Sequence, residues 1–349
     1  MRKNFLSFFI LLLVLGGIYF QKDFSSLVEE KAQPTSSMPM VSGLPGNEVG
    51  QQADGKKDRL YDLMGKDSQD VIALLGHPAR VDKSEYDYDW WVYNEPLSSY
   101  CQIGIEDNKV VSVFVMGDDH SISPFKIGQP LNKLYDIVEI SENVDFEEAG
   151  NIYQFELTKE ELKTSPLVHY KNVWAQVNID KFNKTVSSIR FLDTRTLVKI
   201  RPYELLYRGE LISAKEIDPA MWEEIEKGKA LQILDMTNVL RERNGLRRVN
   251  WDETTAIVAY SHSREMFEEK YFSHSSPING DLSNRLLNGG VLFKVAGENI
   301  AARYVDAISA VEGWLNSEGH RTTLLNKEFT HLGVGVYEKY YTQNFIKAW

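Results

Sequence analysis

The chain has 349 residues, of which 43% are hydrophobic and 11% aromatic. This length exceeds the usual size of one hydrophobic core, so we expect two folded domains, and the composition excludes a wholly disordered chain. The net charge is −11, and Lys and Arg gather only within residues 241–248, so nucleic acid is not an expected partner. Cys101 is the only cysteine, which excludes an intrachain disulfide and a thiolate metal site.

Residues 1–21 have the pattern of a segment that directs export. Arg2 and Lys3 precede an uncharged, mostly apolar run at residues 5–20, and no A-x-A cleavage site follows it. This pattern favours an uncleaved signal anchor over a cleaved signal peptide, although the run is shorter than the ~20 residues that usually span a bilayer. We therefore expect a single-pass protein of the cell membrane with an extracytoplasmic C-terminus. Secretion after signal cleavage is the alternative.

Residues 22–57 are rich in Pro, Gly and Ser and show little apolar periodicity. Such a composition is typical of a flexible tether, which would hold the folded part away from the membrane.

Residues 58–200 contain a weak internal repeat. Residues 65–78 predict a turn and a short helix, and an aromatic strand and a hairpin follow. A similar opening recurs at Gly128, and alternating apolar residues between 175 and 189 predict a second hairpin. We expect an α+β domain of two repeated helix-plus-antiparallel-sheet units. Residues 201–221, which contain two prolines, are interpreted as a linker.

Residues 222–349 predict helices packed on a short sheet. One helix ends near Asn244, and Asp252 is placed to cap a second helix that runs to about Lys270. Further elements are a short helix around Arg285–Leu287, a helix at about 306–317, and a strand pair at 332–337 and 341–345.

Several short blocks in this region follow one another in a characteristic order. The blocks are FSH at Phe272–His274, GENIA at Gly297–Ala301, GHR at Gly319–Arg321 and GVGV at Gly333–Val336. In this order they resemble a bacterial domain of the CAP superfamily, named after cysteine-rich secretory proteins, antigen 5 and pathogenesis-related proteins. The resemblance implies an α/β CAP-type sandwich. The preceding domain, with its Trp90–Tyr93 strand, resembles the CAP-associated N-terminal domain of Gram-positive bacteria.

The resemblance also implies a cavity lined by two histidines and two glutamates, which match His274, Glu298, Glu312 and His320. Two neutral imidazoles, here His274 and His320, can hold Zn²⁺ or another divalent cation, and carboxylates can orient them. Two protein ligands are fewer than the three usual in a catalytic zinc site. The alternative is a hydrogen-bonded network that only satisfies the polar groups of a cavity.

Three hypotheses for function follow. The first is a tethered binding module whose cleft takes a small ligand, a lipid or an envelope component, with or without a metal. The second is a metal- or carboxylate-assisted hydrolase of a cell-envelope substrate, with Glu298 or Glu312 as base. The third is a structural protein whose N-terminal domain recognises an envelope partner. The sequence leaves open which of these holds, and so whether the protein is an enzyme.

Overall fold

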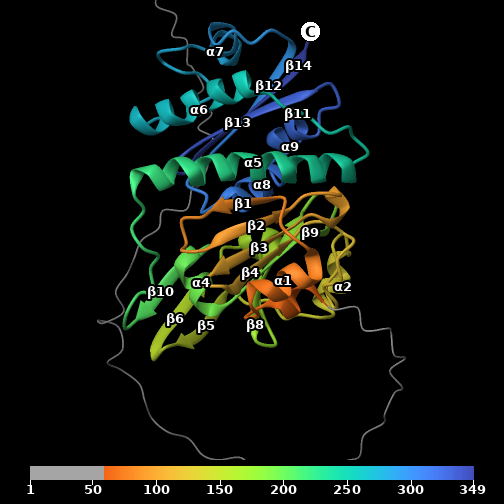
Figure 1. Ribbon diagram of the computed structural model, residues 1–349, viewed down its shortest axis with the longest axis vertical. Coiled ribbons are helices and arrows are strands. Elements are labelled where there is room, and N and C mark those ends of the chain that lie inside the picture. The colour runs from red at the N-terminus through yellow and green to blue at the C-terminus, as the bar shows by residue number, and fades with distance from the viewer. Residues whose placement is uncertain (1–58) are drawn as a thin grey trace, which may run out of the picture.

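The computed structural model describes residues 59–349, which form two domains (Figure 1). The N-terminal domain, coloured orange to green, lies on one side of the long helix α5 (Pro219–Arg243), and the C-terminal domain, coloured teal to blue, lies on the other. The expected anchor at 1–21 and the expected tether at 22–57 lie outside the described residues. Within residues 59–349, no helix is long and apolar enough to cross a membrane.

The N-terminal domain is built on a seven-stranded antiparallel sheet with the order β1-β2-β3-β4-β9-β8-β7. Short helices cover it, and most of its strands are buried on both faces. Its strands are β1 (Arg80–Lys83), β2 (Asp89–Tyr93), β3 (Cys101–Glu106), β4 (Lys109–Val115), β7 (Leu167–Tyr170), β8 (Val173–Asp180) and β9 (Thr185–Leu192). Its helices are η2 (Leu60–Leu63), α1 (Ser68–Leu75), η3 (Leu97–Ser99), α2 (Leu131–Tyr135), α3 (Glu161–Thr164) and α4 (Thr194–Ile200).

The sequence repeat corresponds to two matching halves of this sheet. In the first half, the Gly65 amide donates to the Val110 carbonyl of the β3–β4 hairpin at 2.8 Å. In the second half, the Gly128 amide donates to the Val186 carbonyl of the β8–β9 hairpin, also at 2.8 Å. Both glycines have positive φ, a conformation that an L side chain would strain. The predicted pair of helix-plus-sheet units is thus present, joined where β4 meets β9.

The region expected as a linker is more ordered than predicted. It contains β10 (Glu204–Arg208), which pairs with β6 (Asn151–Glu156) in a three-stranded sheet completed by β5 (Asn143–Glu148). Helix α5 also begins there, because Asp218 caps it and Pro219 occupies its first turn. Proline is favoured at that position, since the first amides of a helix have no intrahelical acceptor. The expected linker at 201–221 therefore contains the strand β10 and the start of α5.

The C-terminal domain is a sandwich in which α5 and α6 enclose a four-stranded sheet with the order β11-β13-β14-β12. The closeness of α6 explains the glycines of the GVGV block, since a Cβ at Gly333 or Gly335 would collide with the helix backbone. The elements are α6 (Glu253–Glu268), α7 (Leu282–Asn288), α8 (Ala307–Leu315), α9 (Glu318–Leu324), β11 (Asn250–Trp251), β12 (Phe293–Ala302), β13 (His331–Tyr337) and β14 (Tyr340–Ala348).

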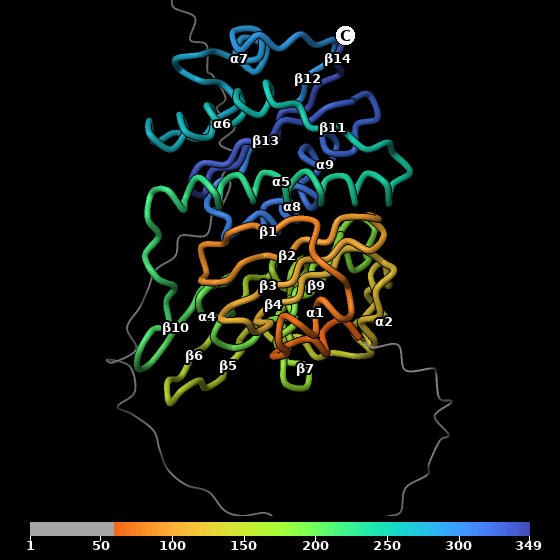
Figure 2. The backbone as a smooth tube through the Cα atoms, in the orientation of Figure 1, coloured from red at the N-terminus to blue at the C-terminus, as the bar shows by residue number. Residues whose placement is uncertain are grey.

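The two domains share one hydrophobic core, to which residues of α5 contribute. Figure 2 shows α5 lying between the two domains. Two ion pairs, one buried and one partly buried, also cross the boundary. Lys229 of α5 bonds to Glu85 at 2.5 Å, and Arg80 of β1 bonds to Asp235 of α5 at 2.9 Å. Because charges buried at an interface must be paired, these contacts tie the two domains in one orientation.

Candidate functional site

The four predicted site residues lie on four different segments of the C-terminal domain. His274 is in the segment between α6 and α7, and Glu298 is on the edge strand β12. Glu312 is on α8, and His320 is on α9. The structure brings three of these side chains to one region of the domain and places Glu312 elsewhere.

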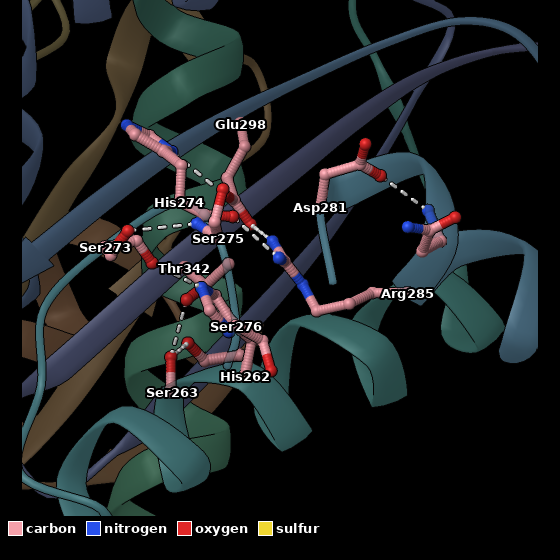
Figure 3. Close-up of polar contacts among 12 residues, drawn as sticks. His262, Ser263, Ser273, His274, Ser275, Ser276, Asp281, Arg285, Glu298 and Thr342 are labelled. Carbon is pink, nitrogen blue, oxygen red and sulfur yellow. Dashed lines mark hydrogen bonds and ion pairs between the residues drawn. The ribbon is translucent and has the colours of Figure 1, made fainter. Parts of the chain in front are cut away.

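Glu298 links His274 to Arg285, a positively charged side chain that the sequence analysis did not assign to the site (Figure 3). Glu298 Oε1 lies 2.9 Å from His274 Nδ1, and Oε2 accepts a hydrogen bond from Arg285 Nη2 at 2.5 Å. The Glu298 and Arg285 side chains are only 3% and 4% exposed, whereas that of His274 is 57% exposed. Arg285 therefore balances a buried carboxylate that in turn orients an accessible imidazole.

Arg285 also fixes the backbone around His274. Its Nη1 donates to the carbonyl oxygens of His274 at 2.7 Å and of Gly280 at 3.1 Å. The sequence held a clue to this role. A glutamate expected inside the domain requires a positive partner, and Arg285 lies in the predicted short helix nearby in the chain. Its pairing with Glu298 depends on the tertiary fold.

His320 is held from its own helix and from β12. Its Nδ1 lies 2.9 Å from the hydroxyl of Ser317, and its backbone carbonyl accepts a bond from Asn299 Nδ2 at 3.1 Å. Burial lowers the pKa of His320 from its ordinary 6.5, and the nearby charge of His274 lowers it further. The two imidazoles thus interact electrostatically, and His320 favours its neutral form.

A buried polar layer lies beside His274 and Glu298, under the segment that carries His274 (Figure 3). His262 Nε2 lies 3.1 Å from the Ser273 carbonyl, and the Ser263 hydroxyl lies 2.8 Å from that of Thr342. Burial lowers the pKa of His262, with a smaller contribution from Arg285. His262 therefore packs inside the domain and supports the loop.

Glu312 does not join His274, Glu298 and His320, which corrects the sequence-based assignment. Its carboxylate accepts hydrogen bonds from the hydroxyls of Ser187 at 2.7 Å and Ser188 at 2.5 Å, both on β9 of the N-terminal domain. The reason is helix geometry. Trp314 of α8 donates to the Ile300 carbonyl in the C-terminal sheet. Glu312 lies two positions before Trp314, so its side chain is rotated about 200° around the helix axis and faces away from that sheet. Burial raises the pKa of Glu312.

The Nε2 atoms of His274 and His320 are suited to hold a cation. Both imidazoles are engaged through Nδ1, and within residues 59–349 neither Nε2 atom has a hydrogen-bond partner. A histidine held through Nδ1 presents Nε2 to a metal, as in many zinc proteins. Across the part of the chain that the structure describes, no group of three or more His, Cys, Asp or Glu side chains is arranged to hold a metal ion. Any cation here would have two protein ligands.

The fold and the site define a class of protein. A sheet enclosed by α5 and α6, with Glu298 on its edge strand and His274 bonded to that glutamate, has the arrangement of a CAP domain. Residues 234–348 match the family described as the cysteine-rich secretory protein family. Residues 64–203 match the family described as CAP-associated N-terminal.

The chain belongs to the family of bacterial proteins that join a CAP-associated N-terminal domain to a CAP domain. It is 46% identical to the membrane protein YlbC of Bacillus subtilis, in an alignment that covers 99% of this chain and 100% of the relative. An extracellular protein containing an SCP domain from Bacillus anthracis is 41% identical with a TM-score of 0.81, covering 87% of this chain and 100% of that one. A cysteine-rich secretory protein from Staphylococcus aureus is 27% identical with a TM-score of 0.72, covering 83% and 96%.

Proposed function

We propose that the cleft of His274, Glu298 and His320 binds a small ligand, lipid or other component of the cell envelope. In this proposal Zn²⁺ or a similar divalent cation is held by Nε2 of the two histidines. The observation that carries the proposal is the state of the imidazoles, which are both anchored through Nδ1 and both free of hydrogen bonds at Nε2 within the described residues.

The surrounding groups suit such a role. Glu298 holds His274 in the tautomer that leaves Nε2 unprotonated, as an orienting carboxylate does in zinc proteins. Arg285 neutralises Glu298, which makes this carboxylate an orienting group and a poor candidate for a direct ligand. A cation held by only two imidazoles has open coordination positions, and an oxygen of the envelope ligand would fill one of them.

The hydrolase alternative receives less support from this arrangement. A general base needs a carboxylate that is free to take a proton from water. Glu298 is engaged by Arg285 and His274, and Glu312 is buried against the N-terminal domain. Binding without catalysis therefore fits the geometry better.

The location is part of the same proposal. We infer that residues 1–21 anchor the chain in the membrane and that both folded domains lie outside the cytoplasm, in line with relatives named as a membrane protein and an extracellular protein. Protease added to intact, wall-stripped cells is expected to remove the CAP domain. Digestion only after lysis would contradict this topology.

Titration calorimetry of the purified protein with Zn²⁺ tests the site. The His274→Ala and His320→Ala variants are each expected to abolish binding, because one remaining imidazole is too weak a site. Glu298→Gln is expected to weaken binding about 10- to 100-fold, as for other orienting partners. The exposed His77 provides the control, since His77→Ala removes an imidazole from the other domain and leaves binding unchanged.

Two outcomes would count against the proposal. If the wild-type protein does not bind Zn²⁺ or related cations, the cation site does not exist and the hydrogen-bonded network remains as the interpretation. If the His274→Ala, His320→Ala double variant binds as tightly as wild type, the cation lies elsewhere.

A further inference from the structure

We infer that the N-terminal domain takes part in the CAP site, because the turn between β8 and β9 fixes the start of α9 and so positions His320. The turn comprises residues 180–184, and it belongs to the second repeat of the N-terminal domain. This inference rests on the proposed function only in the experiment that measures cation binding.

The first contact is an ion pair beside the histidine. Arg321, the residue after His320, places Nη1 2.9 Å from Asp180 Oδ2. The two side chains are 14% and 8% exposed, so water screens this pair only weakly. The Arg321 guanidinium also lies 5.1 Å from the centre of the Phe182 ring in the same turn.

The second contact is a reciprocal pair of hydrogen bonds at the corner between α8 and α9. The Lys181 amide donates to Asn316 Oδ1 at 2.9 Å, and Asn316 Nδ2 donates to the Ile179 carbonyl at 2.8 Å. Asn316 directly precedes Ser317, whose hydroxyl lies 2.9 Å from the His320 ring. The N-terminal domain thus holds the backbone on both sides of the residue that orients His320.

The turn is built to hold this position. Asp180 Oδ1 accepts hydrogen bonds from the amides of Phe182 and Asn183, both at 3.0 Å, and Asp180 Oδ2 accepts one from Asn183 Nδ2 at 2.9 Å. One carboxylate therefore both closes the turn and binds Arg321. The Ser187 and Ser188 bonds to Glu312 hold α8 one turn before the corner, so the carboxylate first assigned to the cleft belongs to this supporting contact.

This arrangement has a consequence for binding. Functional side chains must be held within about 0.5 Å of their working geometry by the residues around them. The support for His274 comes from Glu298 and Arg285 within the CAP domain, whereas part of the support for His320 comes from the other domain. Residues of the β8–β9 turn are thus positioning residues for the cleft.

The test is Asp180→Asn, which keeps the shape of the side chain and the bonds from the Phe182 and Asn183 backbone amides. It removes the charge that binds Arg321, together with the acceptor oxygen for Asn183 Nδ2. Zn²⁺ affinity is expected to fall about 10-fold or more, as for other outer partners of metal-binding histidines. Long-range ¹H–¹⁵N correlation spectra of the His320 ring, recorded without metal, are expected to change from one fixed tautomer to an average of two.

A matched control separates positioning from loss of interface stability. Glu85→Gln makes the same chemical change in another ion pair between the domains, with Lys229 of α5. Among the described residues, neither Glu85 nor Lys229 has a hydrogen bond or ion pair with α9. Glu85→Gln is expected to lower the melting temperature but to leave Zn²⁺ affinity and the His320 ring signals at wild-type values. If Asp180→Asn does not fold, Phe182→Ala removes only the ring under Arg321, which is 44% exposed, and is expected to act in the same direction.

The inference is overturned if folded Asp180→Asn or Phe182→Ala protein shows wild-type His320 signals and wild-type Zn²⁺ affinity. It is also overturned if Glu85→Gln changes these readouts as much as Asp180→Asn does, because the effect would then be general destabilisation. Failure of the wild-type protein to bind Zn²⁺ would reject the proposed function alone, since the metal-free ring spectra would still decide the positioning role.

Discussion

The hydroxyl of Ser188 donates a hydrogen bond to Glu312 Oε1 at 2.5 Å, and this bond crosses the boundary between the two domains. Glu312 therefore belongs to the interface, although its place in the CAP motif had assigned it to the cleft. We predict that Glu312→Gln lowers Zn²⁺ affinity much less than Glu298→Gln does, because it alters only the support of α8. A loss of affinity in calorimetry comparable to that of Glu298→Gln would return Glu312 to the site.

The same variant tests the pH dependence of stability. Burial raises the pKa of Glu312 above 4.5, and the bonds from Ser188 and Ser187 oppose that shift. A carboxyl with a raised folded pKa stabilises the fold below its unfolded pKa, and this contribution is lost as pH rises through the folded value. Glu312→Gln lacks this dependence. In urea unfolding measured at increasing pH from below pH 4.5, the free energy of unfolding of the wild type should therefore fall relative to that of the variant.

Arg285 is predicted to contribute more to stability than any surface arginine. Arg285→Met leaves the buried Glu298 carboxylate without a counter-charge, and the expected loss is about 3–5 kcal/mol. Arg264→Met makes the same change in an exposed pair with Glu268, where water screens the charges and the expected loss is much smaller. Urea denaturation of the two variants provides the comparison. Equal losses would show that the buried Glu298–Arg285 pair contributes no more to stability than an exposed pair.

The two histidines of the cleft are predicted to titrate interdependently. In an NMR titration His320 should show a pKa below 6.5, mainly because of burial and secondly because of His274. His274→Ala is expected to raise that pKa only part of the way to 6.5, whereas His77→Ala should not change it. Because the folded pKa is depressed, the neutral form is favoured in the fold, and stability is lost as pH falls from 6.5 through the folded value. An unchanged His320 pKa in His274→Ala would mean that the rings are too far apart to share a ligand.

The two domains are predicted to unfold together. Arg190 on β9 is fully buried and pairs with Asp306, the cap of α8, at 2.5 Å. Asp306→Asn leaves this buried cation uncompensated and is expected to cost about 3–5 kcal/mol. Differential scanning calorimetry should show a single transition in both proteins, shifted to lower temperature in the variant, because the core is continuous. Two separate transitions, with only one of them shifted, would show that the domains are energetically independent.

Local and patterned features of the chain were predictable from the sequence. Asp252 caps α6 as predicted, accepting a bond from the Thr255 amide, because an N-cap depends only on neighbouring residues. The repeat that begins at Gly65 and Gly128 was detectable because each half must satisfy the same turn geometry. The ordered blocks around His274, Glu298 and His320 were sufficient to identify the CAP fold.

Tertiary structure alone decided which charges meet. Glu312 and Ser188 are 124 residues apart, and Arg285 reaches Glu298 only because α7 packs against β12. The direction in which a helical carboxylate points depends on which face of the helix the rest of the protein covers, and a motif does not encode that rotation. The sequence of this protein therefore determined its family and predicted His274 and His320, whereas the packing of the elements on one another decided that Glu298 lies against His274 and Glu312 against the N-terminal domain.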